Sequence, residues 1–207
     1  MKPFRLCLIL ALAVLVALGT TASAQSFAWT MKGSKTPVPS TGVGYTDLLK
    51  VNYFSNANTA GAPDGTVRVT NPGSGAGDLC AQIYVFDQYQ EMSECCACLV
   101  TPDGLRTLSV NSDLTSNPLT GVTLQTGSVS IVSGIVPPSG VCSPLNYFVY
   151  PTIRAWGTHI QNSTFAETET EYSDRAIGPW NDNLLFECYA IALDGSGHGV
   201  CSCGSGD

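Results

Sequence analysis

The sequence is poor in charged residues and in histidine. Asp, Glu, Lys and Arg make up 12% of its 207 residues, and it holds only two histidines, His159 and His198. Soluble domains usually carry about a quarter of charged residues. Nine basic residues against 16 acidic ones give a net charge of −7. An acidic chain with so few cations is unsuited to nucleic acid or anionic lipid, and we predict no nucleic-acid partner.

Long apolar runs are absent after the first 24 residues. The run at the start has the form of a secretory signal peptide, with Lys2 and Arg5 before 13 apolar residues and Ala22-Ser23-Ala24 as the cleavage site. We predict a signal peptide over 1–24, a secreted, periplasmic or cell-surface location, and no membrane span after cleavage. Loss of Lys2 and Arg5 leaves seven basic residues against 16 acidic ones, a net charge of −9.

Cysteine, by contrast, is abundant. Cys7 falls within the predicted signal peptide, and an even number remains after cleavage. Cysteines in an oxidising compartment usually end as disulfides. We therefore predict four intramolecular disulfides, whose pairing the sequence does not choose. The residues are Cys80, Cys95, Cys96, Cys98, Cys142, Cys188, Cys201 and Cys203.

Three of these cysteines crowd into the segment ECCAC, and a second C-x-C pair follows at Cys201 and Cys203. A four-thiolate zinc site from Cys96, Cys98, Cys201 and Cys203 is one interpretation, but exposed thiolates oxidise, so we favour disulfides. A C-x-x-C motif at a helix start, as a thioredoxin-like redox site requires, is absent. In a strand, Cys96 and Cys98 would share one face and Cys95 the other, which would tie the segment to two parts of the fold. A vicinal Cys95–Cys96 bridge is the minority alternative.

Most of the chain reads as short strands separated by Gly, Pro, Asn and Ser. Residues 66–71 alternate apolar and polar side chains, and residues 79–87 are rich in β-branched and aromatic residues. Strands are also predicted near 105–110, 123–133 and 146–162, while 47–54 fits a strand or a helical turn. Gly127 indicates a bulge or a close approach.

One segment departs from the β pattern. Asn181 or Asp182 can cap a helix, and Leu184, Cys188, Ile191 and Ala192 then follow on one helical face. We predict a helix over 182–193, ended by Gly195 and Gly197, with Cys188 directed at a partner in the core.

These elements predict a mainly β fold: an antiparallel sandwich-like domain, stapled by disulfides, with one C-terminal helix. We divide the chain into the signal peptide, a flexible Gly/Ser/Pro-rich arm over 25–46, and a single domain over 47–207. The arm carries Phe27 and Trp29, for which two interpretations stay open: they dock on their own domain, or they contact a partner.

Candidate catalytic groups are few. Glu167, Glu169 and Glu171 alternate along a predicted strand and would share a face, which suits paired glycosidase carboxylates or calcium ligands. A solvated acidic edge that blocks sheet pairing is the favoured interpretation. His159 reads as a half-exposed or backbone-bonded strand residue, and His198 as part of a tight Gly-rich turn. We predict no catalytic residue, no metal and no cofactor.

Several segments together resemble small secreted cysteine-rich proteins of acidobacterial-type soil bacteria. The segments are VRVTNPG, DLCAQIYVFDQYQEMSECCACLVTPDGLRTLSVNSDLTSNPLTG, AWGTHIQN and GSGHGVCSCG. The resemblance implies an exported bacterial protein, and brings no activity, cofactor or catalytic residue with it. It also implies that the cysteine framework is part of the family pattern, with Cys142 outside it. That framework comprises Cys80, Cys95, Cys96, Cys98, Cys188, Cys201 and Cys203.

The leading hypothesis is an exported non-enzymatic structural, adhesive or binding protein, a subunit of a surface or extracellular assembly. Its expected partners are other copies of the chain or cell-surface components. A second hypothesis is a secreted polysaccharide hydrolase that uses Glu167, Glu169 and Glu171. A third is an extracytoplasmic metal-binding or redox protein.

Overall fold

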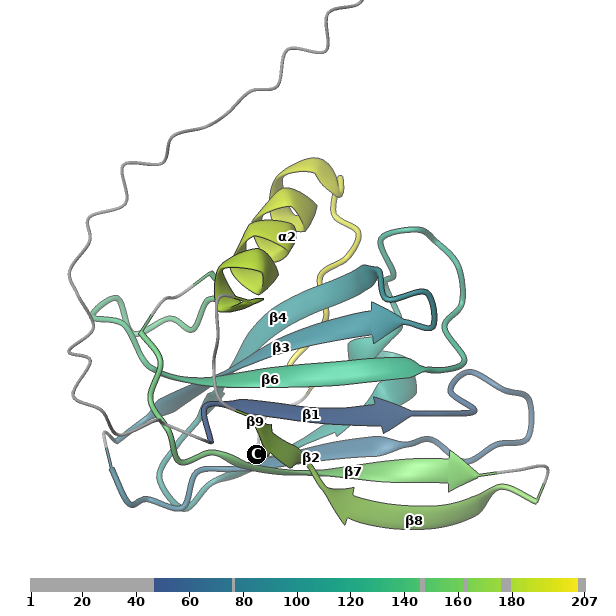
Figure 1. The fold of residues 1–207 in the computed structure, drawn as a ribbon, viewed down its shortest axis with the longest axis horizontal. Coiled ribbons are helices and arrows are strands. Elements are labelled where there is room, and N and C mark those ends of the chain that lie inside the picture. The colour runs from purple at the N-terminus through teal and green to yellow at the C-terminus, as the bar shows by residue number, and fades with distance from the viewer. Residues whose placement is uncertain (1–46, 76, 146–147, 162–163, 176–179, 205–207) are drawn as a thin grey trace, which may run out of the picture. The chain divides into compact units, whose positions relative to one another are not determined.

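The computed structural model describes residues 47–207, apart from positions 76, 146–147, 162–163, 176–179 and 205–207. Figure 1 shows two β-sheets, built from β1 to β9, and a late helix, α2. Within these residues, the predicted mainly β, sandwich-like, disulfide-stapled domain with one C-terminal helix is confirmed. The predicted signal peptide and the arm with Phe27 and Trp29 lie outside the described residues.

The first sheet has the strand order β4-β3-β6-β1-β9, and all its pairs are antiparallel. β3 lies between two long neighbours and is buried on both faces over its first seven residues. This burial explains why it gave the clearest strand pattern in the sequence. The strands are β1 (Leu49–Phe54), β3 (Leu79–Asp87), β4 (Met92–Val100), β6 (Gly127–Ile135) and β9 (Ser173–Arg175).

The second sheet has the order β5-β2-β7-β8 and is also antiparallel. Val67 and Val69 of β2 are buried and their neighbours are half-buried, so the predicted two-residue period of this strand is confirmed. The strands are β2 (Thr66–Thr70), β5 (Leu105–Ser109), β7 (Arg154–Gln161) and β8 (Ala166–Glu171).

The main hydrophobic core lies where the inner faces of the two sheets meet. It joins Ile83 and Ile131 of the first sheet to Val69 and Leu108 of the second. On one side of the sandwich the chain itself connects the sheets. Tyr172 is the single residue between β8 and β9, is buried, and donates its backbone N–H to Ala155 O at 2.9 Å. The chain therefore changes sheets without leaving the core.

Helix α2 (Trp180–Asp194) covers the outer face of the first sheet above β4, β3 and β6 (Figure 1). It begins before the predicted cap, so Asn181 and Asp182 belong to the helix. Cys188 is buried, as predicted, but Ala192 is exposed. Among the side chains of residues 183–194, the other buried ones are Leu185 and Ile191, which flank Cys188 at three-residue intervals on the side that contacts β4.

The remaining strand predictions need smaller corrections. Residues 49–54 form a strand, and β6 begins at Gly127 rather than at Thr123. A Cβ at Gly127 would lie 2.1 Å from the carbonyl oxygen of Phe86, so the predicted close approach is confirmed. A single strand, β7, occupies the predicted 146–162 region, with one isolated bridge at Val149.

A π-helix over Val110–Leu114 follows β5 and was not predicted. Local side-chain bonds close this turn: Ser112 N donates to Ser109 Oγ at 2.7 Å, and Ser109 N donates to Asp113 Oδ2 at 2.8 Å. Val110 and Leu114 turn into the core. The turn therefore depends on two polar side chains and two buried apolar ones, a pattern without a regular period.

Candidate functional site

The cysteines converge on one region, which we call the β4–tail junction: strand β4 together with residues 195–204, the tail that follows α2. Cys95 is bonded to Cys188 of α2 on the outer face of the first sheet. Cys96 and Cys98 point to the other face and are bonded to Cys201 and Cys203 of the tail. The predicted alternation of faces, and the link to two parts of the fold, are confirmed.

Outside the junction, Cys80 of β3 is bonded to Cys142 in the loop after β6. All eight cysteines of the described domain are thus in disulfides, and the minority alternative, a vicinal Cys95–Cys96 bridge, is not formed. Four disulfides fit an extracellular or periplasmic protein.

Backbone bonds also hold the tail against β4. Cys95 N donates to Gly199 O at 2.9 Å, and Cys201 N donates to Cys95 O at 3.3 Å. These bonds form a short parallel bridge between Cys95 and Val200 at the outer edge of the first sheet. The tail therefore covers part of an edge strand that would otherwise expose unpaired backbone groups.

The tail also contacts the π-helix over Val110–Leu114 and strand β5 of the second sheet. Ser202 Oγ donates to Asp113 Oδ1 at 2.6 Å, and Ser202 N donates to Asp113 O at 2.9 Å. Arg106 donates from Nη1 to Cys203 O at 3.3 Å and from Nη2 to Leu99 O at 2.9 Å. The tail thus closes the side of the sandwich between β4 and β5.

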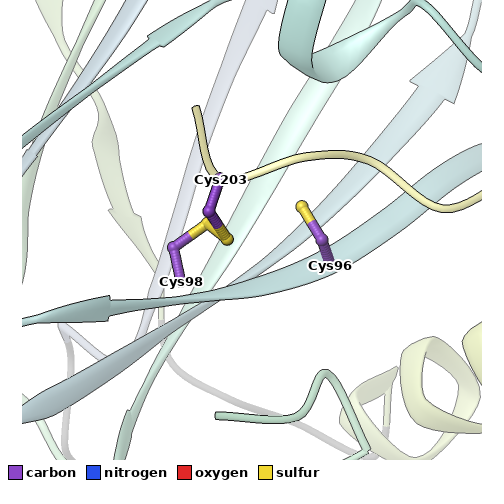
Figure 2. A group of neighbouring side chains, drawn as sticks. All are labelled: Cys96, Cys98 and Cys203. Atoms are coloured by element: carbon purple, nitrogen blue, oxygen red, sulfur yellow. A yellow bond between two sulfur atoms is a disulfide. The ribbon is translucent and has the colours of Figure 1, made fainter. Parts of the chain in front are cut away.

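Two of the junction disulfides lie against each other. Figure 2 shows the Cys98–Cys203 bridge with the sulfur of Cys96 beside it. The Sγ atoms of Cys96, Cys98 and Cys203 all lie within 4.8 Å of one another. Cys201 joins the group through its bond to Cys96. The four residues named in the zinc interpretation are therefore neighbours, although each sulfur is bonded to another sulfur.

Glu94 is the buried acid of the junction, and its exposed fraction is 0%. Its Oε1 accepts a hydrogen bond from Asn117 N at 2.9 Å, and its Oε2 has no partner among the described residues. Burial raises the pKa of Glu94 to about 7, and the hydrogen bond from Asn117 opposes the shift. Sequence reasoning missed this residue, because a glutamate between strand residues usually faces solvent.

Asn117 connects the loop before β6 to the tail. Its Nδ2 donates to Gly197 O at 2.9 Å and to Val200 O at 3.2 Å, while its Oδ1 lies 3.1 Å from His198 Nδ1. His198 is exposed in the Gly-rich turn, as predicted. The hollow beside it, about 400 Å³, is lined mainly by amide and hydroxyl side chains. They include Asn58, Asn111, Thr115, Ser116, Asn117 and Thr123.

His159 lies elsewhere, on β7. Of the two predicted alternatives, the half-exposed histidine is wrong because the residue is buried, whereas a backbone hydrogen bond is present, at Tyr53. It stacks on Tyr53 with ring centroids 4.0 Å apart, and its Nε2 lies 2.6 Å from Thr170 Oγ1. Burial lowers the pKa of His159. These contacts indicate a packed structural histidine, held between the Tyr53 ring and the hydroxyl of Thr170 on the edge strand β8.

The three glutamates of β8 lie on one exposed edge strand, as predicted. Glu169 forms an ion pair with Arg68, and Glu171 forms one with Arg154 at 3.1 Å. None of the three glutamates lines the hollow beside His198 or the α2 cavity described below. The structure therefore brings two of these carboxylates, Glu169 and Glu171, to arginines on an exposed edge strand.

Helix α2 carries an exposed apolar face. Phe186, Tyr189 and Leu193 are 65%, 43% and 62% exposed. Their spacing places them along one stripe of the helix. A cavity of about 400 Å³ adjoins this stripe, and Phe186 and Ala190 line it together with Met92 and Leu119. We call this stripe and its cavity the α2 surface; sequence reasoning missed it because it considered only the buried face.

Comparisons with known proteins identify no relative. In the described part of the chain, no helix combines the length and apolar character needed to cross a membrane. The resemblance to acidobacterial cysteine-rich proteins stays a prediction. No protein-family model, no curated protein and no solved structure matches the chain.

Proposed function

We propose that this chain is an exported, non-enzymatic structural or binding protein, which joins an extracellular or surface assembly by self-association through the α2 surface. The proposal includes removal of residues 1–24 as a signal peptide. The observation that carries it is the stripe of Phe186, Tyr189 and Leu193 on a helix that is itself bonded to β4 through Cys188. An isolated exposed apolar residue needs no explanation, but an apolar patch beside a cavity is typical of an interaction surface.

The attachment of α2 favours binding because a fixed helix loses little conformational entropy when a partner docks. Cys188 is bonded to Cys95, and two further residues of the helix, Leu185 and Ile191, are buried on the same side. A partner would therefore meet a preformed surface, which lowers the cost of association.

Three of the four edge strands, β4, β9 and β8, support this route of assembly over strand addition. The tail covers part of the β4 edge, β9 has only three residues, and β8 carries three exposed glutamates. Such edges resist pairing with another chain. The arm with Phe27 and Trp29 remains a second predicted contact, and its role requires a separate test.

The test measures the mass of the exported chain in solution over a rising concentration series. We expect concentration-dependent association of the native chain, and loss of association in the double variant Phe186→Ser/Leu193→Ser. Val141→Ser, an exposed apolar position in the loop after β6, is the matched control and should behave like the native chain. A truncation that starts at Tyr45 separates a contribution of the arm from that of α2.

A native chain that stays monomeric at the highest concentration would rule out self-association and leave only a binding protein for a different partner. Equal association of the double variant and the Val141→Ser control would remove the α2 surface from the proposal. The hydrolase hypothesis is weaker, because no described cleft collects the β8 carboxylates.

A further inference from the structure

We propose that, when its cysteines are reduced, the chain binds one thiophilic divalent cation, Zn²⁺ or Cd²⁺, through a four-thiolate site of Cys96, Cys98, Cys201 and Cys203. The proposal does not depend on the α2 surface. It concerns the thiol state that the chain passes through before its disulfides form.

The first support is the arrangement of the four sulfurs. The Sγ atoms of Cys96, Cys98 and Cys203 lie within 4.8 Å of one another, and Cys201 is bonded to Cys96. In a tetrahedral zinc–thiolate site, sulfurs lie about 2.3 Å from the metal and hence roughly 3.8 Å from each other. Three of the four sulfurs are therefore already close to this spacing, and after reduction a rotation of the Cys201 side chain has to bring its sulfur, which lies outside the group of three, to the same ion.

The second support is that contacts without sulfur hold β4 and the tail together. Two backbone bonds join Cys95 to the tail, at Gly199 and Cys201. Arg106 binds the carbonyl oxygens of Leu99 and Cys203 with separate nitrogens, and Ser202 binds Asp113. These contacts favour the same register of the two C-x-C pairs when the S–S bonds are absent.

The third support is the local charge. A divalent cation with four thiolates carries a net charge of −2, which a neighbouring cation stabilises. The Arg106 guanidinium reaches both β4 and the tail, next to Cys98 and at Cys203. Asp113 opposes this effect, but it accepts two hydrogen bonds from Ser202, which lies between the two tail cysteines.

Metal binding and disulfide formation are two reactions of the same four thiols. On binding, four thiols release four protons, and their sulfurs form four bonds to the metal ion. On oxidation, each of two small-molecule disulfides takes two electrons from a pair of thiolates, and becomes two thiols by taking up two protons. Two protein disulfides form and the metal ion is released. Metal and disulfides are thus alternative states of the same four sulfurs.

The test uses the exported chain, reduced with a phosphine and titrated with Co²⁺ and then Zn²⁺ under nitrogen. Two complementary variants separate the sites. The first variant keeps only the four proposed ligands and has Cys→Ser at 80, 95, 142 and 188. The second variant keeps only Cys80, Cys95, Cys142 and Cys188 and has Cys→Ser at 96, 98, 201 and 203. Absorption reports tetrahedral cobalt–thiolate coordination, and circular dichroism reports the β fold.

We expect the reduced native chain and the first variant to bind one Co²⁺ per chain, with a four-sulfur spectrum that Zn²⁺ displaces. The second variant should bind at least about 100-fold more weakly. Adding oxidised glutathione to the native complex should release the metal. Because metal binding and folding are coupled, metal should also increase the β signal even where the metal-free variant is unfolded.

Similar affinities of the two variants would overturn the proposal, because they would reflect nonspecific thiol binding. A spectrum with fewer than four sulfurs per metal ion would also overturn it. So would the absence of a cobalt–thiolate spectrum in the reduced native chain, whether or not that chain is folded.

Discussion

The two sides of the sandwich are closed in different ways. Between β4 and β5, the separate tail is held by two disulfides, Cys96–Cys201 and Cys98–Cys203, and by a few backbone bonds. On the other side, the continuous chain crosses from β8 to β9 at Tyr172. The closure by the tail therefore depends on the redox state of the protein, whereas the closure by the continuous chain does not.

The side without disulfides uses polar contacts between its strands instead, and one of them involves a buried lysine. Lys50 of β1 is only 1% exposed, and its Nζ forms an ion pair with Asp174 of β9. Asn52 Nδ2 donates to Thr170 Oγ1 at 3.2 Å, which links β1 to β8. Complete burial of a lysine is rare without a partner, so this side depends on matched charges.

Reduction should have the largest effect, because it removes the covalent part of the first closure. Each native bridge in a small secreted domain is typically worth about 2–5 kcal/mol, whereas net stability is about 5–15 kcal/mol. We expect the metal-free, fully reduced chain to unfold or nearly so. Thermal melts with and without reductant measure this effect, and a melting temperature that hardly changes would show that the core alone maintains the fold.

Change of pH should have the next largest effect, through Glu94. The carboxyl has a pKa of about 7 in the folded chain and an ordinary value of 4.5, so the folded state retains the proton over that interval. The contribution of Glu94 to the unfolding free energy is therefore highest below pH 4.5 and falls as pH rises towards and through 7. As pH rises through this range, we expect the unfolding free energy to fall by about 2–4 kcal/mol because of Glu94.

The variant Glu94→Gln isolates this effect, because it cannot ionise. His159 acts in the opposite direction, since its lowered pKa makes stability fall as pH drops below 6.5. The measured quantity is therefore the difference in unfolding free energy between native and variant chains across pH 4–8. A difference that does not change with pH would contradict the predicted proton uptake.

Removal of the Asp174 carboxylate should have the smallest of the three effects, on the side without disulfides. Asp174→Ala leaves Lys50 buried without its ion-pair partner, and we expect a loss of about 2 kcal/mol because the Asp174 side chain is 40% exposed. The double variant Lys50→Met/Asp174→Ala should recover most of this loss. Chemical denaturation of the oxidised proteins measures both changes, and no recovery in the double variant would exclude an unpaired lysine as the cause.

Sequence reasoning was most accurate where a local pattern determines the structure. The alternation in β2 predicted a half-buried strand, and the spacing of Cys95, Cys96 and Cys98 predicted two faces of one strand. Gly127 was correctly associated with a close approach. Each of these predictions needs only neighbours along the chain, since strand geometry alternates side chains regardless of the partner.

The parts that could not be predicted depend on residues far away in the sequence. Lys50 is buried because Asp174, 124 residues later, returns to pair with it. Glu94 is buried because the loop at Asn117 folds over it. The outer apolar face of α2 was also missed, because a helix pattern shows which residues can be buried together, but not which face the rest of the protein covers.

The wide sequence separation of the junction disulfides has a consequence for the order of folding during synthesis. Cys95, Cys96 and Cys98 pair with residues 93, 105 and 105 positions later. Because a chain emerges from its N-terminal end, these three thiols must wait until nearly the whole domain has emerged. Cys80, whose partner is 62 positions later, can be bonded first. A chain interrupted before Cys188 would hold three adjacent reactive thiols, and would be open to mispairing with other molecules.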